Sequence, residues 1–69
     1  MTNTELLEQK IKESGKKKGY LAGKCGLSRA GFRNCVINDA EFTATQINVL
    51  CMELNITSLK ERHAIFFAG

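Results

Sequence analysis

The sequence has no long apolar run, and this absence argues against a membrane protein. No stretch approaches the ~18 apolar residues that a membrane span needs. The N-terminal segment MTNTELLEQK lacks the charged-then-apolar order of a signal peptide. The three cysteines, an odd number at positions 25, 35 and 51, do not make a disulfide framework. We therefore expect a cytoplasmic protein with reduced thiols and no membrane partner.

The residue patterns of common catalytic and metal sites are missing as well. There is no glycine-rich phosphate loop after a strand and no pair of acids positioned for a catalytic pocket, so we expect neither enzyme activity nor a cofactor. Cys25, Cys35, Cys51 and His63 have the composition of a zinc set, but no pair has the C-x2-C or H-x3-H spacing of such sites. We expect no metal site, and we expect His63 to be an exposed or partly packed helical residue.

The 69 residues, 43% apolar and 25% charged, predict one globular domain over residues 1–69. A chain of this length buries only about 60% of the surface that it exposes when unfolded, so its stability should be a few kcal/mol. A deep enzyme pocket is not expected in so small a domain.

Acidic residues are absent from residues 14–38, whereas six basic residues lie there and give this segment a charge of +6. The rest of the chain holds four basic and seven acidic residues, a charge of −3. A solvated lysine-rich face would carry acids interleaved at helical spacing. A block of one sign instead indicates a phosphate-bearing partner. The six residues are Lys16, Lys17, Lys18, Lys24, Arg29 and Arg33.

Capping residues and apolar spacing predict five helices and no long strand. The first helix starts at a Thr2–Glu5 capping box, turns Leu6, Leu7 and Ile11 to one side, and ends at Gly15. The second runs from Lys17 to Cys25, with Tyr20 or Leu21 inward, and Gly26 provides a left-handed stop. The third covers 28–37 with Ser28 as its N-cap. The fourth helix begins at a Thr43–Gln46 capping box and is stopped by Asn55. The fifth begins at Ser58 and Glu61 and runs to the chain end. Its last part, Ile65–Ala68, could instead be extended.

Two helices joined by a short glycine-containing turn, at 17–25 and 28–37, have the order of a helix-turn-helix unit. Ala22 must be small where the helices cross, and Gly26 permits the tight turn. Through Leu21-Ala22-Gly23-Lys24-Cys25-Gly26-Leu27-Ser28 the chain resembles the lambda-repressor/Cro type of helix-turn-helix regulator, the Xre family. The resemblance covers most of the chain and implies a compact five-helix lambda-repressor-like DNA-binding domain. The ending from Asn55 to Glu61 looks like short phage and prophage regulators of Gram-positive bacteria.

The resemblance implies that one face of the helix 28–37 enters the major groove of a double-stranded DNA operator. Arginine can donate two hydrogen bonds to guanine, and asparagine can pair similarly with adenine. The side chains expected to contact bases are Ser28, Arg29, Ala30, Arg33 and Asn34. The alternative for Arg29 and Arg33 is that they bind phosphates or are exposed solubilising charges. The residues expected to bind phosphates precede or open the helix 17–25, or follow the helix 28–37, and they are Lys16, Lys17, Lys18 and Asn38.

Proteins of this type usually pair on DNA, so we expect a homodimer, at least on the operator. A small domain cannot easily bury neighbouring aromatic rings in its own core, which makes Ile65, Phe66 and Phe67 the expected interface. The alternative for these residues is that they close the core over the first helix.

A different function on the same scaffold is an antirepressor or antitoxin that binds another protein, such as a second phage regulator. The acid-free basic block argues against it, because the core of a protein interface tends to exclude lysine. Cro-like repression of transcription is therefore the function that the sequence favours.

Overall fold

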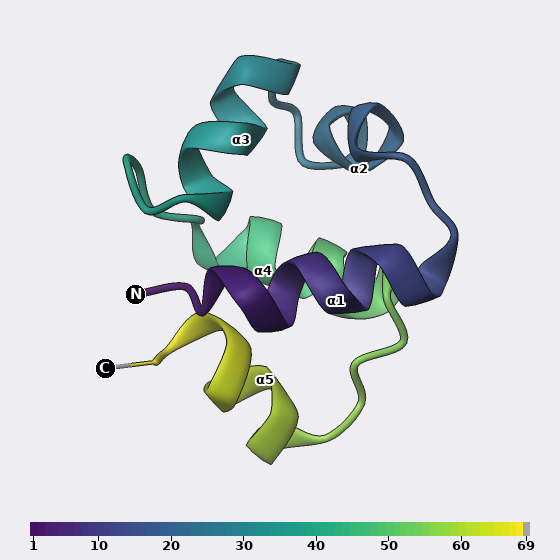
Figure 1. The fold of residues 1–69 in the computed structure, drawn as a ribbon, viewed down its shortest axis with the longest axis vertical. Coiled ribbons are helices and arrows are strands. Elements are labelled where there is room, and N and C mark those ends of the chain that lie inside the picture. Colours follow the sequence, from purple (N-terminus) through teal and green to yellow (C-terminus); the bar gives the residue numbers. More distant parts are fainter. Residues whose placement is uncertain (69) are drawn as a thin grey trace.

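Five α-helices follow one another along the chain in the computed structural model, which describes residues 1–68. Residues 1–68 contain no strand, so the predicted all-α, five-helix architecture is confirmed. As Figure 1 shows, α1 crosses the middle of the molecule, with α2 and α3 on one side of it and α5 on the other. The bounds of the helices are α1 (Thr4–Ser14), α2 (Lys18–Lys24), α3 (Arg29–Val36), α4 (Ala44–Glu53) and α5 (Leu59–Phe66).

All five helices contribute to one buried core. Phe42, in the segment between α3 and α4, lies edge-on to both Phe32 and Phe66, with ring centroids 5.8 and 5.9 Å apart. This aromatic row joins α3 to α5 through a residue that belongs to neither helix. The other core residues are Leu7, Ile11, Leu21, Ala22, Cys35, Val36, Ile47, Leu50, Cys51, Leu54, Ile56 and Ile65.

The N-terminus of α1 differs from the prediction. The N-cap is Asn3, whose side chain accepts a hydrogen bond from the Leu6 N–H, so the Thr2–Glu5 capping box is wrong. Thr2 is buried, and its backbone N–H is bonded to Asn38 instead. Leu6 is exposed, because Leu7 and Ile11 alone form the buried face of α1. The helix does end at Gly15, which has a φ of 73°.

Besides Gly15, three helix ends have a left-handed residue, at Gly26, Asn38 and Asn55, and these three share one pattern of two backbone hydrogen bonds. After α2, the Leu27 N–H bonds to the Ala22 carbonyl and the Gly26 N–H to the Gly23 carbonyl, which is the Schellman pattern. Gly26 has a φ of 71°, as expected for the predicted stop. The helix itself is one residue shorter at each end than the predicted Lys17 to Cys25. Of the two alternatives for its inner face, Leu21 is buried and Tyr20 is exposed.

The predicted N-caps of the later helices are confirmed. Ser28 and Ser58 each accept a hydrogen bond from the third residue beyond them. Thr43 and Gln46 form both bonds of the capping box, which fixes the start of α4.

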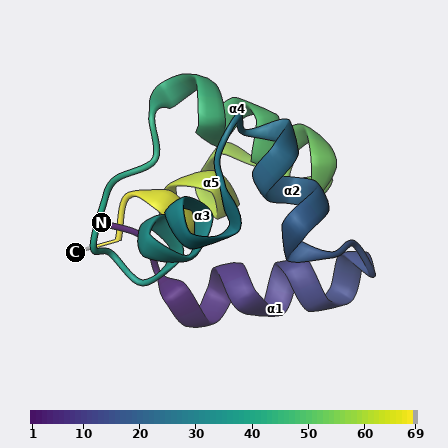
Figure 2. The same ribbon diagram turned by 90° about the horizontal axis from the view of Figure 1, so that it is seen from above.

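The two ends of the described chain lie side by side (Figures 1 and 2). The Asn3 N–H donates to the Ile65 carbonyl, and the Ala68 N–H donates to the Met1 carbonyl. Ile65 and Phe66 are helical, and the helix ends at Phe66, so the predicted continuation to the chain end is too long by two described residues. Gly69, the last residue of the predicted fifth helix, lies outside the described residues.

Ile65 and Phe66 are buried in the core at 1% and 3% exposure, so they do not form the expected dimer interface. They pack inward because their apolar side chains are removed from water in the core, and the Asn3 N–H bond to the Ile65 carbonyl joins α5 to the start of α1. Phe67 alone of the three is half exposed, with its ring 5.6 Å from that of His63.

Candidate nucleic-acid interface

The helix-turn-helix unit consists of α2, the turn from Cys25 to Ser28, and α3 (Figure 2). Ala22 is 1% exposed, as its place at the contact of the two helices requires. Leu27 packs against the core from the turn. Gln46 of α4 donates from Nε2 to the Cys25 carbonyl, so the first turn of α4 supports the end of α2. The unit is therefore held by side chains from outside it as well as by its own turn.

The orientation of α3 is fixed by its inner face and by its C-terminal end. Phe32, Cys35 and Val36 are buried. The Thr4 hydroxyl donates to the Val36 carbonyl at 2.6 Å, which attaches the end of α3 to the start of α1. Burial of this face leaves the opposite side of α3 open to solvent.

The open side of α3 carries all the residues that the sequence predicts as base contacts. These five residues are exposed, and they are Ser28, Arg29, Ala30, Arg33 and Asn34. Ser28 has a second role, since its Oγ accepts from the Gly31 N–H at 3.0 Å as the N-cap. Its hydroxyl hydrogen is the part that remains for a base or a phosphate.

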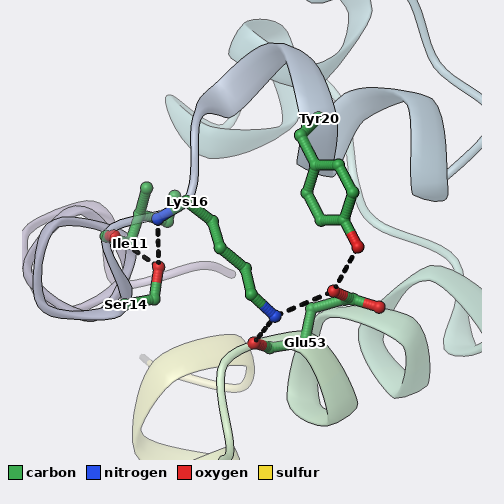
Figure 3. A network of polar contacts seen from close by, with 5 residues as sticks. All are labelled: Ile11, Ser14, Lys16, Tyr20 and Glu53. Atoms are coloured by element: carbon green, nitrogen blue, oxygen red, sulfur yellow. Dashed lines mark hydrogen bonds and ion pairs between the residues drawn. The ribbon is translucent and has the colours of Figure 1, made fainter.

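Two of the three lysines expected on phosphates form ion pairs within the protein. Lys16 Nζ lies 2.9 Å from Glu53 Oε1 and donates to the Glu53 carbonyl at 2.7 Å, and the Tyr20 hydroxyl donates to the same carboxylate (Figure 3). Lys18 Nζ lies 2.8 Å from Glu8 Oε2. Lys16 therefore ties the loop after α1 to the C-terminal end of α4, and Lys18 ties α2 to α1. Sequence spacing gives no sign of either pair.

Asn38 is also used inside the fold. Its Oδ1 accepts from the Thr2 N–H at 2.8 Å, and its Nδ2 donates to the Thr2 carbonyl at 2.9 Å. Both polar atoms of the Asn38 side chain therefore help to hold the N-terminus in place, and one N–H of the Nδ2 group is left to donate to a phosphate.

The other cations of the basic block form no ion pair with a residue in 1–68; they are Lys17, Lys24, Arg29 and Arg33. Lys24 lies over the Tyr20 ring, with Nζ 5.6 Å from the ring centroid. Lys17, Arg29 and Arg33 line a common hollow, so three cations without an ion pair, one at the N-cap of α2 and two on α3, gather at one place.

This hollow, which we name the α2–α3 hollow, has a volume of about 550 Å³. Its floor is apolar and its rim is basic, with Glu8 as the one acid on it. The sequence did not reveal it, because its residues are up to 29 positions apart in the chain. It is lined by Glu8, Lys17, Lys18, Gly19, Arg29, Phe32, Arg33, Val36 and Ile37.

Two groups near the unit have shifted pKa values. Hydrogen bonds from Lys16 and then Tyr20 lower the pKa of the Glu53 carboxyl, so it is charged and paired at neutral pH. Burial raises the pKa of the Cys25, Cys35 and Cys51 thiols, so they pack as small neutral groups. Within residues 1–68, no three His, Cys, Asp or Glu side chains are grouped so as to hold a metal ion.

Comparisons with protein-family models, curated proteins and solved structures returned no match to this chain. None of the helices in residues 1–68 has the length and apolar character needed to cross a membrane. The assignment of function therefore depends on the chemistry of α2 and α3.

Proposed function

We propose that this protein is a small sequence-specific DNA-binding regulator that inserts α3 into the major groove of a double-stranded operator. The observation that carries the proposal is the outer face of α3, where Arg29, Arg33 and Asn34 are exposed and neither arginine pairs with an acid of residues 1–68. Side chains of this kind can bond to guanine and adenine edges.

The surroundings of α3 support the same function. A helix in the groove must be rigidly held, and α3 is fixed by its buried face and by the Thr4 contact. Lys17, the N-cap of α2, borders the same hollow as the arginines, and we expect it to meet the DNA backbone there. Lys16 and Lys18 are already paired, so we expect fewer phosphate contacts per subunit than the basic block alone implies.

The resemblance to short phage regulators suggests the biological role, a Cro-like repressor of phage or prophage genes in the cytoplasm. We further propose that it binds DNA as a homodimer, since one unit covers only a half-site. Of the predicted interface residues, only Phe67 remains available for this contact.

The experiment that tests the proposal is selection of bound sequences from random duplex DNA at moderate salt, followed by sequencing. We expect enrichment of an inverted repeat with half-sites about one helical turn, 10–10.5 base pairs, apart. Affinity should fall with salt at a slope of about −0.9 for each phosphate contact. A pool that stays random, with no salt dependence, would contradict the proposal.

The α2–α3 hollow favours a second candidate, an antirepressor or antitoxin that uses this surface to bind another regulator. Its apolar floor would suit a partner side chain, and Ile37 beside it is exposed. This candidate predicts that replacing both Arg29 and Arg33 by alanine leaves any preference for one DNA sequence unchanged, whereas the DNA-reading function predicts loss of that preference.

A further inference from the structure

The guanidinium group of Arg29 lies directly against the backbone of Gly19 on the neighbouring helix. A β-carbon added at Gly19 would be 2.8 Å from Arg29 Nε, 2.9 Å from Nη2 and 3.2 Å from Cζ. Real β-carbons do not approach other atoms closer than 3.0 Å, so any side chain at residue 19 would push the guanidinium away. The space that Arg29 occupies exists only because residue 19 is glycine.

Gly23, four residues further along α2, provides the contrast. A β-carbon there would have no neighbour within 4 Å. Both glycines lie in the same helix, and glycine is less favourable than alanine within a helix. The packing of Arg29 therefore requires glycine at residue 19, whereas no packing contact requires glycine at residue 23.

The contact with Gly19 bears on whether Arg29 binds a phosphate or a base of the DNA. A guanidinium resting on α2 is turned toward the first turn of that helix, where Lys17 and Lys18 border the same hollow. Lys18 already has Glu8 as its partner, whereas Lys17 and Arg29 have no acid partner within residues 1–68. Two cations without an acid partner on one hollow suit a phosphate, to which the arginine fork binds well. Arg33, one turn further along α3, and Asn34 are left to face the bases.

We propose that Gly19 is a positioning residue, and that it holds Arg29 against α2 so that Arg29 binds a backbone phosphate together with Lys17 while Arg33 and Asn34 read the bases. This inference rests on the proposed DNA-binding function. It differs from the leading expectation from sequence, which places Arg29 among the base contacts, and agrees with the alternative that Arg29 binds a phosphate.

The test compares Gly19→Ala with Gly23→Ala, which makes the same replacement in the same helix without touching Arg29. Binding of the purified full chain is measured by fluorescence anisotropy on the selected duplex and on a random duplex over a range of salt concentrations. We expect Gly23→Ala to bind like the wild type. We expect Gly19→Ala to bind both duplexes more weakly by the same factor, with the salt slope smaller by about 0.9, the loss of one phosphate contact.

Two further measurements separate positioning from a general effect on the fold. The thermal midpoint of Gly19→Ala should not fall, because only the mobile end of one side chain must move. The Arg29 Nε–Hε resonance of the free protein should shift in Gly19→Ala and not in Gly23→Ala. In an Arg29→Ala background, Gly19→Ala should have no additional effect on DNA affinity.

Three outcomes would overturn the inference: equal DNA affinities for the two alanine variants, a loss confined to the selected duplex, or an effect that persists without Arg29. The second outcome would make Arg29 a base-reading residue. If the wild type bound no duplex at all, the proposed DNA-binding function would be wrong, and the role of Gly19 and Arg29 would be wrong with it. This result differs from the three outcomes above, in which the wild type does bind DNA.

Discussion

The side chain of Asn38 is bonded through both of its polar atoms to the backbone of Thr2, with distances of 2.8 and 2.9 Å across 36 residues of chain. Asn38 has a φ of 69°, the left-handed conformation that ends α3. One residue therefore both terminates the candidate recognition helix and fastens the N-terminus to it. Asn55 ends α4 with a similar φ of 56°, and its side chain forms no hydrogen bond within residues 1–68.

Asn38→Gly should lower the free energy of unfolding by about 1–3 kcal/mol, because the Thr2 N–H and carbonyl lose their partners in a partly buried place. Asn55→Gly should change it by less than about 0.5 kcal/mol, since glycine adopts the left-handed conformation without strain. Urea unfolding followed by circular dichroism measures both. If Asn38→Gly and Asn55→Gly lowered the free energy of unfolding equally, the hydrogen bonds from Asn38 to Thr2 would add no stability to that of the helix end itself.

Gly23→Ala should raise the free energy of unfolding by about 1 kcal/mol. The position is helical and exposed, and the added methyl group meets no neighbour within 4 Å. In a domain of this size the thermal midpoint should rise by about 4–8 °C. Gly26→Ala is the matched control, and because of its φ of 71° it should be destabilised by about 1–2 kcal/mol. A fall in the midpoint of Gly23→Ala would contradict the open space at this site.

Glu53 should make stability depend on pH in acid. Its pKa lies below the ordinary value of 4.5 in the folded protein, owing to the Lys16 and then the Tyr20 hydrogen bonds. The stabilisation is therefore fully present above about pH 4.5 and is lost as the pH falls through the folded pKa. Glu53→Gln should flatten the decline of the thermal midpoint below pH 4.5. Glu41→Gln, at an exposed residue without an ion pair to residues 1–68, should leave the decline as in the wild type.

Phe66 and Phe67 are neighbours in sequence with different expected contributions to folding. Phe66→Ala should cost about 3–5 kcal/mol, because it empties the space beside Phe42 in the core. This is comparable with the whole stability of a 69-residue domain, so the variant should be largely unfolded at 25 °C. Phe67→Ala should remain folded, since its ring is 49% exposed. Far-ultraviolet circular dichroism distinguishes the two, and an unfolded Phe67→Ala would place that ring in the core after all.

The features predicted correctly from sequence are those whose physical cause is local. Ser28, Thr43 and Ser58 cap helices through bonds to residues three positions away. Gly26 stops α2 because glycine tolerates a positive φ. The exposure of the predicted base contacts on α3 follows from the spacing of its buried residues.

The features missed are those that depend on partners distant in the chain. The sequence predicts Thr2 as an N-cap, but its backbone N–H is bonded to Asn38, and Asn3 is the N-cap. Lys16 was expected on phosphate, and its partner Glu53 is 37 residues away. Such pairs leave no periodic signal in the sequence.

The sequence by itself determined that this chain forms five helices and where most of them begin and end. It also determined that the positive charge is concentrated around α2 and α3. Both follow from the sequence because caps, turns and charge content are properties of short segments. Only the tertiary structure decided which charges remain free, which of Ile65, Phe66 and Phe67 faces solvent, and that Arg29 rests on Gly19. These outcomes depend on how helices pack against each other, and packing is set by the shape of the whole core.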